Sequence, residues 1–560
     1  MKKAISLLVA LMLVVTITAC GGNQNSSQST NTPANPSPEI TLPGAPGSVN
    51  VSTPETPASS TEPSKPADSD EKEYGGVVKM ITAADTTYPF GLPWNSGSNN
   101  ASQVQVPYSE TLVFGKTSGA LEPYLATDWT VDIEKGEVLL KLREDVFFSD
   151  GSKFNAAVVE WNFDKSIETR ALNPVASGIS KIEARSEYEV AVIMMDGFTN
   201  MALPLLFSRT FGFASKENYD KVGDTVAGEI PVGTGPYVLK EKVPGVKVVY
   251  EANKNYWQPD KPYLDLFEFH VITDVMTQTA SMLSKGPDAI DVLNQTNSEQ
   301  IMTLREDPDL TIITYPNSVV TMYPSSKNEG SPLAKKEVRE AISLALNREA
   351  IAEAKGFGIL EPAKQMIARG YYGWFDDGRN YYPYDQSRAK DLLSQAGYPN
   401  GFKTTLYCPG SIDRDIAVAV QEMLRLIGIE ADMEFPESGL VTELRTVSGW
   451  EGLMLGTFLS ASSAPTTYRI QLDPTYQYYI STWRPVEEMM PDYDMMRRTP
   501  AFDVGIFQSL HSIMAENMII IPILTSNTTY IVRNCVRDAE FGFWGLGTVF
   551  RIENMWRASN

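Results

Sequence analysis

Few residues in this sequence are of types and spacings that could do chemistry. Its two histidines, His270 and His511, belong to neither an HExxH motif nor a two-histidine metal spacing. No GxSxG elbow and no GxxxxGKS or GxxxxGKT phosphate loop is present. The sequence therefore lacks the usual motifs of zinc-dependent hydrolases and of hydrolases with a catalytic triad. We expect that the protein is not an enzyme and binds no cofactor.

The best local pair of acids is Asp376-Asp377, beside Trp374 and Phe375. Sugar sites often combine two carboxylates with aromatic platforms, so an exported cell-wall glycosidase is the alternative function of another class. The competing interpretation of the pair is a solvated loop with surface acids, which is the commoner use of aspartate.

The stretch Gly233-Thr234-Gly235-Pro236-Tyr237 has the glycines of a phosphate-binding loop. Proline removes one of the N–H donors that such a loop needs. The residues that follow, Tyr237, Val238 and Leu239, predict a strand, so no helix N-terminus faces the loop. The glycines are expected to serve a backbone turn.

The length of 560 residues predicts two or more lobes. Apolar residues make up 42% and charged residues 21% of the chain, an ordinary globular balance. The net charge of -22 repels phosphate backbones and argues against a nucleic-acid partner.

The N-terminus has the pattern of an export signal. Lys2 and Lys3 precede a short apolar run that ends in small residues before Cys20, which resembles the bacterial lipobox. This predicts a signal peptide over 1–19, a lipidated Cys20 and a flexible tether over 20–73, rich in Ser, Thr and Pro. The folded part is expected to begin at Tyr74.

Apolar periodicity alternates between helix and strand spacing, so the chain is expected to be mixed α/β. Helices are predicted within 335–354, 385–396 and 414–427, with Asp385 as an N-cap and Gly428 as a C-cap. Strands are predicted within 137–144, 246–253, 266–273 and 429–435. Cys408 and Cys535 are expected to be separate buried thiols.

Several ordered blocks resemble the family 5 solute-binding proteins of ABC importers, the oligopeptide, dipeptide and nickel group. The blocks are Leu125–Lys165, with its Phe-x-Asp-Gly turn, Gly233–Trp257, Ser331–Glu353, where Asn347 replaces the usual Asp, and Tyr382–Phe402. They follow one another in the order of the family pattern between Leu125 and Phe402, and we expect the resemblance to extend over the chain from Tyr74 onward.

The resemblance implies a two-lobed α/β fold, periplasmic-binding-protein-like (type II, cluster C), with a hinge and an interlobe ligand cleft. Lobe I would comprise 74–315 and 520–560 with an extra subdomain, and lobe II would comprise 316–519. The crossovers are expected within 314–326 and 518–529. The implied protein is a monomeric, lipid-anchored receptor on the outer face of the cytoplasmic membrane, serving a membrane ABC permease and its ATPase subunits.

Two departures from the family pattern concern the ligand. The aspartate with which peptide binders pair the peptide ammonium falls at Ser460 or Ala461, and the arginine of some dipeptide binders falls near Tyr407. A buried ammonium without a countercharge is costly. We therefore expect a non-peptide organic solute, with an oligopeptide or dipeptide as the alternative and no metal. The predicted ligand-binding residues are Tyr88, Phe90, Trp94, Trp374, Tyr407, Cys408, Thr457, Phe458, Ser460 and Arg469.

Overall fold

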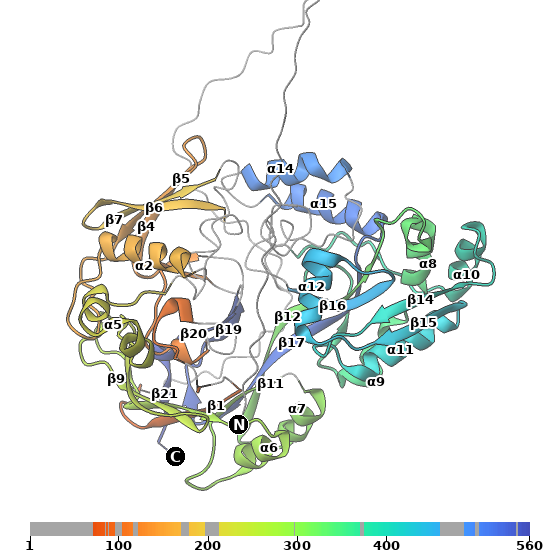
Figure 1. Ribbon diagram of the computed structural model, residues 1–560. Helices are drawn as coiled ribbons and strands as arrows, with labels where there is room; N and C mark the ends of the chain where they lie inside the picture. Colours follow the sequence, from red (N-terminus) through yellow and green to blue (C-terminus); the bar gives the residue numbers. More distant parts are fainter. Residues whose placement is uncertain are drawn as a thin grey trace, which may run out of the picture. The chain divides into compact units, whose positions relative to one another are not determined.

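The structure is a computed structural model, shown in Figure 1. It describes residues 71–83, 86–87, 89–95, 103–115, 121–169, 178–195, 212–295, 297–369, 374–459, 487–498, 503–544 and 547–559. The predicted signal peptide, Cys20 and tether lie outside these residues.

An 11-stranded mixed sheet runs through the described part of the chain, in the order β15-β14-β16-β12-β17-β11-β1-β10-β9-β8, with β13 paired to β17. Its strands are β1 (Val77–Thr82), β8 (Tyr237–Val243), β9 (Lys247–Ala252), β10 (Leu266–Val271), β11 (Val292–Gln295), β12 (Leu310–Pro324), β13 (Glu361–Pro362), β14 (Phe402–Tyr407), β15 (Ile429–Glu434), β16 (Leu453–Leu459) and β17 (Ile521–Arg533). The strands predicted within 137–144, 246–253, 266–273 and 429–435 are all present.

The long strands β12 and β17 connect the two halves of this sheet. The first half of β12 pairs with the last half of β17, which also pairs with β11. The second half of β12 lies between β17 and β16. The register of β12 against β17 shifts between Pro316 and Ser318, and again between Val320 and Thr321. Both segments predicted as crossovers therefore contribute to strands that run from one half of the sheet to the other (Figure 1).

Each half of the sheet has its own hydrophobic core, which gives the fold two lobes. In the first lobe, side chains of β1, β9 and β10 pack with the end of β17 and the C-terminal segment around Met555. In the second, β14, β15 and β16 pack with helices that follow residue 335. The predicted lobe boundaries at 315/316 and 519/520 fall within β12 and just before β17, and they remain predictions.

A second sheet, in the order β4-β5-β7-β6, belongs to the first lobe, and α2 packs against it. Asn155 caps α2 by accepting a hydrogen bond from the Val158 backbone N–H. These elements are β4 (Ala126–Asp132), β5 (Glu137–Leu142), β6 (Ile179–Ser186), β7 (Glu189–Met194) and α2 (Ala156–Glu168). Short strand pairs are β2 (Val113–Gly115) with β3 (Leu121–Pro123), β18 (Val536–Arg537) with β21 (Trp556–Arg557), and β19 (Phe541–Trp544) with β20 (Gly547–Phe550).

The remaining helices include α10 and α11, which confirm the helices predicted within 385–396 and 414–427. They are α5 (Lys216–Glu229), α6 (Val275–Leu283), α7 (Ser298–Arg305), α8 (Lys336–Ala345), α9 (Arg348–Gly356), α10 (Gln386–Gln395), α11 (Arg414–Arg425), α12 (Ser438–Glu443), α14 (Met490–Arg498) and α15 (Val504–Glu516). Shorter 3-10 turns are η1 (Pro93–Asn95), η4 (Pro332–Ala334), η6 (Glu487–Met489) and η7 (Ile552–Asn554), and η5 (Leu444–Ser448) is a π-helix.

Asp385 caps α10 as predicted. The C-cap of α11 is Leu426 and not the predicted Gly428, which follows two residues later with φ 91°. The prediction of a single helix within 335–354 was wrong, because the structure has two helices there, α8 and α9. The side chain of Asn347 accepts a hydrogen bond from the Ala350 N–H and starts a new helix.

The Gly-Thr-Gly-Pro-Tyr stretch is a backbone turn, as predicted. Gly235 N–H donates to Tyr108 O at 2.9 Å, and Tyr237 N–H donates to Pro107 O at 2.9 Å. A Cβ on Gly233 would lie 1.9 Å from Tyr108 O, so no side chain fits there. Two backbone segments can approach this closely only through glycine.

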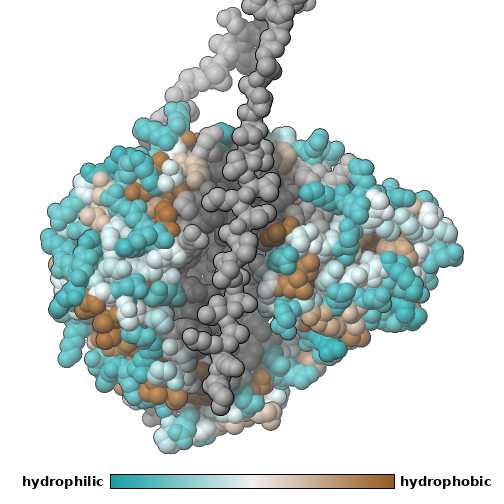
Figure 2. Space-filling view, viewed as in Figure 1, coloured by the Kyte–Doolittle hydropathy of each residue, from teal (hydrophilic) through white to brown (hydrophobic). Residues whose placement is uncertain are grey.

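The outer surface is mainly hydrophilic on the face shown in Figure 2, where the hydrophobic residues form small, separate patches. No helix in the described part of the chain is long and apolar enough to cross a bilayer.

Candidate functional site

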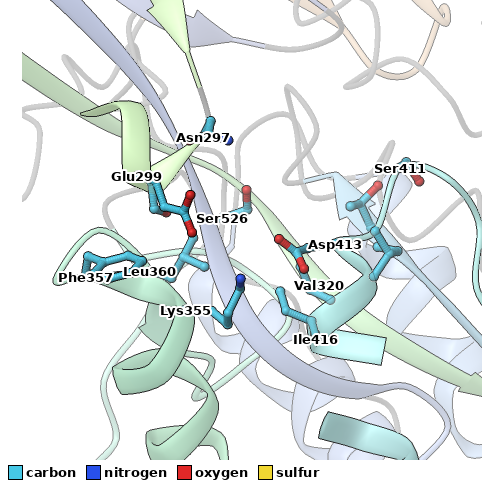
Figure 3. Close-up of a pocket in the computed structure, with 13 residues that line it drawn as sticks. Asn297, Glu299, Val320, Lys355, Phe357, Leu360, Ser411, Asp413, Ile416 and Ser526 are labelled. Atoms are coloured by element: carbon cyan, nitrogen blue, oxygen red, sulfur yellow. The ribbon is translucent and has the colours of Figure 1, made fainter. Parts of the chain in front are cut away.

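A pocket of about 440 Å³ lies where β12, β16 and β17 meet the ends of three helices (Figure 3). Its lining includes residues of α7, which packs in the core of the first lobe, and of α9 and α11 in the second. The lining residues are Asn297, Ser298, Glu299, Val320, Lys355, Phe357, Leu360, Ser411, Ile412, Asp413, Ile416, Thr457 and Ser526.

The sheet supplies one side of this pocket. Val320 on β12 pairs with Thr457 on β16, and two residues earlier Ser318 pairs with Ser526 on β17. These partners are fixed by the strand register, so the hydroxyls of Thr457 and Ser526 come from strands on either side of β12. The apolar side chains of Leu360, Ile412 and Ile416 complete the lining.

Three helix ends meet at the pocket. Asn297 caps α7 by accepting from the Gln300 N–H, and Asp413 caps α11 by accepting from the Asp415 N–H. The third helix, α9, contributes its C-terminal end, because it terminates at Phe357, whose φ is 47° and whose side chain lines the pocket. Two helix N-termini and one C-terminus thus place backbone partial charges beside the pocket.

The ionic side chains of the lining converge in Figure 3, where Glu299, Lys355 and Asp413 point into the same space. The Lys355 ammonium pairs with Asp415 at 2.7 Å. That hydrogen bond, followed by the charges of Asp413, Asp415 and Glu299, raises the pKa of Lys355 against the opposing effect of burial. Because Asp415 already engages this one lysine, carboxylates are in excess here.

Of the ten residues predicted to bind ligand, Thr457 lines this pocket. Tyr407, at the end of β14, packs against the core formed around Met454 and Phe507. Cys408 is 2% exposed, and burial raises the pKa of its thiol to about 11. Cys408 and Cys535 are both free and buried, as predicted.

The aromatic predictions lie in other clusters. Phe90 packs in the core of the first lobe, with the Lys242 ammonium 4.8 Å from its ring centroid. Trp94 contacts Trp161 edge-on at 5.7 Å in a separate cluster of that lobe. Trp374 packs against a core of the second lobe. Tyr88, Ser460, Arg469 and the side chain of Phe458 lie outside the described residues, and all these residues remain predictions.

Sequence reasoning missed most of the lining. Asn297 and Asp413 could have been found as helix N-caps, because each is an Asn or Asp directly before an amphipathic run. Nothing local indicates that their two helices, more than a hundred positions apart, begin at the same pocket. That information comes from the pairing of β12 with β16 and β17.

The acidic pair of the alternative hypothesis has local partners. Asp377 accepts hydrogen bonds from the Arg379 Nε at 2.6 Å and the Tyr381 hydroxyl at 2.6 Å. Burial acts to raise the pKa of Asp377, but the hydrogen bonds from Tyr381 and Arg379 lower it to about 2. A glycosidase acid needs the opposite shift. No group of three or more potential metal ligands occurs among the described residues.

Comparison with known proteins gives matches over most of the chain. The family described as bacterial extracellular solute-binding proteins, family 5 Middle, matches residues 120–479. The glutathione-binding protein GsiB of Escherichia coli strain K12 is 30% identical over 374 residues, which are 64% of this chain and 70% of GsiB.

Two solved structures have the same fold. HbpA2 from Haemophilus parasuis aligns with a TM-score of 0.75 at 19% identity, over 86% of this chain and 100% of HbpA2. The periplasmic binding protein DppA from Helicobacter pylori, in complex with the peptide STSA, aligns with a TM-score of 0.68 at 21% identity, over 87% and 98% of the two chains. These alignments support the two-lobed fold.

Proposed function

Because the chain belongs to the bacterial extracellular solute-binding proteins of family 5, we propose that it captures a small solute between its lobes and delivers it to the permease of an ABC importer. The observation that carries this proposal is the pocket lined by residues of both lobes. A ligand that contacts both lobes stabilises the closed arrangement because it binds the closed state more tightly than the open state. Closure of the lobes then indicates that ligand is bound.

The solute proposed is a non-peptide organic molecule. Ser460 and Ala461 stand where peptide binders have the ammonium-pairing aspartate, and Tyr407 stands where some have arginine. In support, the side chain of Tyr407 packs against an apolar core and brings no charge. The second candidate is a peptide, favoured by the relatives, since GsiB is a glutathione-binding protein and DppA was solved with a peptide.

The proposed location is the outer face of the cytoplasmic membrane, with the monomer anchored by lipid on Cys20. The lipobox-like sequence and the tether over 20–73 support it. Changing Cys20→Ser should release the protein into the medium or leave it unprocessed, and labelling with a radioactive fatty acid should disappear. Persistent labelling would contradict the assignment of Cys20.

The test of the ligand is mass spectrometry of what the purified full-length protein releases on denaturation. A single non-peptide mass supports the first proposal, whereas a ladder of short peptides supports the second. Thr457→Val keeps the strand-forming shape but removes the hydroxyl from the pocket, and it should reduce the retained solute. Thr405→Val on β14, outside the lining, is the matched control. Wild-type protein that retains nothing and binds no solute would refute the proposed function.

A further inference from the structure

The charges of the pocket point to one class of solute. Resting on the proposed function, we propose that the pocket selects a solute with a cationic group, an ammonium or guanidinium, held between Glu299 of the first lobe and Asp413 of the second. The apolar part of the solute would lie against Leu360, Ile412 and Ile416.

Acidic residues outnumber basic ones in the lining of the pocket. Within the described lining, Glu299 and Asp413 are acidic and Lys355 is the basic residue. Lys355 binds the carboxylate of Asp415 at 2.7 Å, so it neutralises a residue outside the lining. Glu299 is exposed, and its charge is among those that raise the pKa of Lys355. One ammonium, that of Lys355, is therefore shared by three carboxylates, which leaves an excess of negative charge at the pocket.

The helix ends beside the pocket offer another explanation for these acids. Each helix N-terminus carries roughly half a positive charge, so acids at the starts of α7 and α11 are stabilised without any ligand. The two N-termini together offset about one carboxylate, while the C-terminus of α9 adds roughly half a negative charge. The pocket stays negative after this correction.

Both acids are positioned by the first turns of their helices. Asp413 uses a carboxylate oxygen to cap α11 through the Asp415 N–H at 2.8 Å, which fixes the orientation of the group. A carboxylate has about four acceptor sites, so this bond leaves capacity for a ligand. Glu299, in the first turn of α7, points toward the same space in Figure 3. A cation between them would contact both lobes at once.

The experiment uses the full-length protein and probes that share a five-carbon chain: cadaverine, pentanediol and glutarate. Thermal shift is measured for the wild type and for Glu299→Gln, Asp413→Asn and Glu306→Gln. Asn still caps a helix, so Asp413→Asn preserves the start of α11. Glu306→Gln removes a negative charge from the exposed C-cap of the same α7 and is the control for Glu299→Gln.

Cadaverine should raise the melting temperature of the wild type and of Glu306→Gln, and glutarate should not. Each pocket variant should bind cadaverine roughly tenfold or more weakly, as expected for the loss of one charge-assisted hydrogen bond. A larger shift with glutarate than with cadaverine would overturn the inference, as would equal cadaverine binding by the variants.

If none of the three probes shifts the wild type, the solute released by denaturation decides. A released solute that carries a basic group and is lost from both pocket variants supports the inference. A released solute without a basic group refutes the inference and leaves the proposed function standing. Wild-type protein that releases no solute and binds none refutes the proposed function itself.

Discussion

Glu110 gives the sharpest test of the energetics of the first lobe. Its carboxyl is 3% exposed and accepts hydrogen bonds from the Tyr256 hydroxyl at 2.7 Å and the Trp257 indole N–H at 3.1 Å. Burial raises the pKa of Glu110 to about 7 from its ordinary 4.5, although the hydrogen bonds from Tyr256 and Trp257 act to lower it. The nearby charge of Glu553 adds to the rise.

The sign of the effect on stability follows from these two pKa values. Between pH 4.5 and about 7 the folded protein holds a proton on Glu110 that the unfolded chain releases. The free energy of unfolding should therefore fall as the pH rises through this window and become level above it. At 1.36 kcal/mol per pKa unit, the fall assigned to Glu110 is about 3 kcal/mol.

The perturbation is Glu110→Gln, which keeps an acceptor oxygen for Tyr256 and Trp257 but cannot ionise. Urea unfolding of the wild type, Glu110→Gln and the exposed control Glu306→Gln is measured at pH 5 and pH 8. Between these pH values the unfolding free energy of the wild type and the control should fall by about 2.5 kcal/mol more than that of Glu110→Gln, since part of the window lies below pH 5. Parallel pH dependence in all three proteins would refute the assignment of a protonated, buried Glu110.

Two further predictions concern the same lobe. Gly233→Ala should lower the unfolding free energy by more than about 3 kcal/mol in a urea melt, because its Cβ would overlap Tyr108 O, whereas Gly410→Ala, with open space around its Cβ, should change it by less than about 0.5 kcal/mol. Asp291→Asn should lower the unfolding free energy by about 3 kcal/mol, because the buried Asp291 pairs with Arg557 at 2.6 Å. The control is Asp432→Asn at an exposed position. An effect of Asp291→Asn no larger than that of the control would contradict the prediction.

The elements that sequence predicted best are those whose signals are local. The apolar stripe of α11 and the glycine after it lie within one short window, and so do the alternating residues of β15. The prediction failed between α8 and α9, where a helical pattern continues through Asn347 but the chain starts a second helix. The cap of α9 is a single side-chain hydrogen bond, which periodicity does not reveal.

The two-lobed fold came from the resemblance of ordered blocks, since periodicity alone indicates only a mixed α/β chain. The strands β12 and β17 illustrate why. They lie about two hundred positions apart in sequence, yet each pairs along most of its length with the other. Such pairing depends on how the buried side chains of the whole sheet pack together in both lobes. The sequences of the two strands alone do not specify it.

The candidate site was harder to predict because its residues are ordinary in their local context. Glu299 and Asp413 are each explained by the start of a helix, and Lys355 by the end of one. The predicted site residues were instead mainly aromatic. One of them, Trp94, packs against Trp161 and Tyr219 in the first lobe. Charges that stabilise three separate helices become a selective environment only where the chain brings those helix ends together. The electrostatic character of the pocket is therefore a property of tertiary structure, and its test requires altering the charge while keeping each helix cap intact.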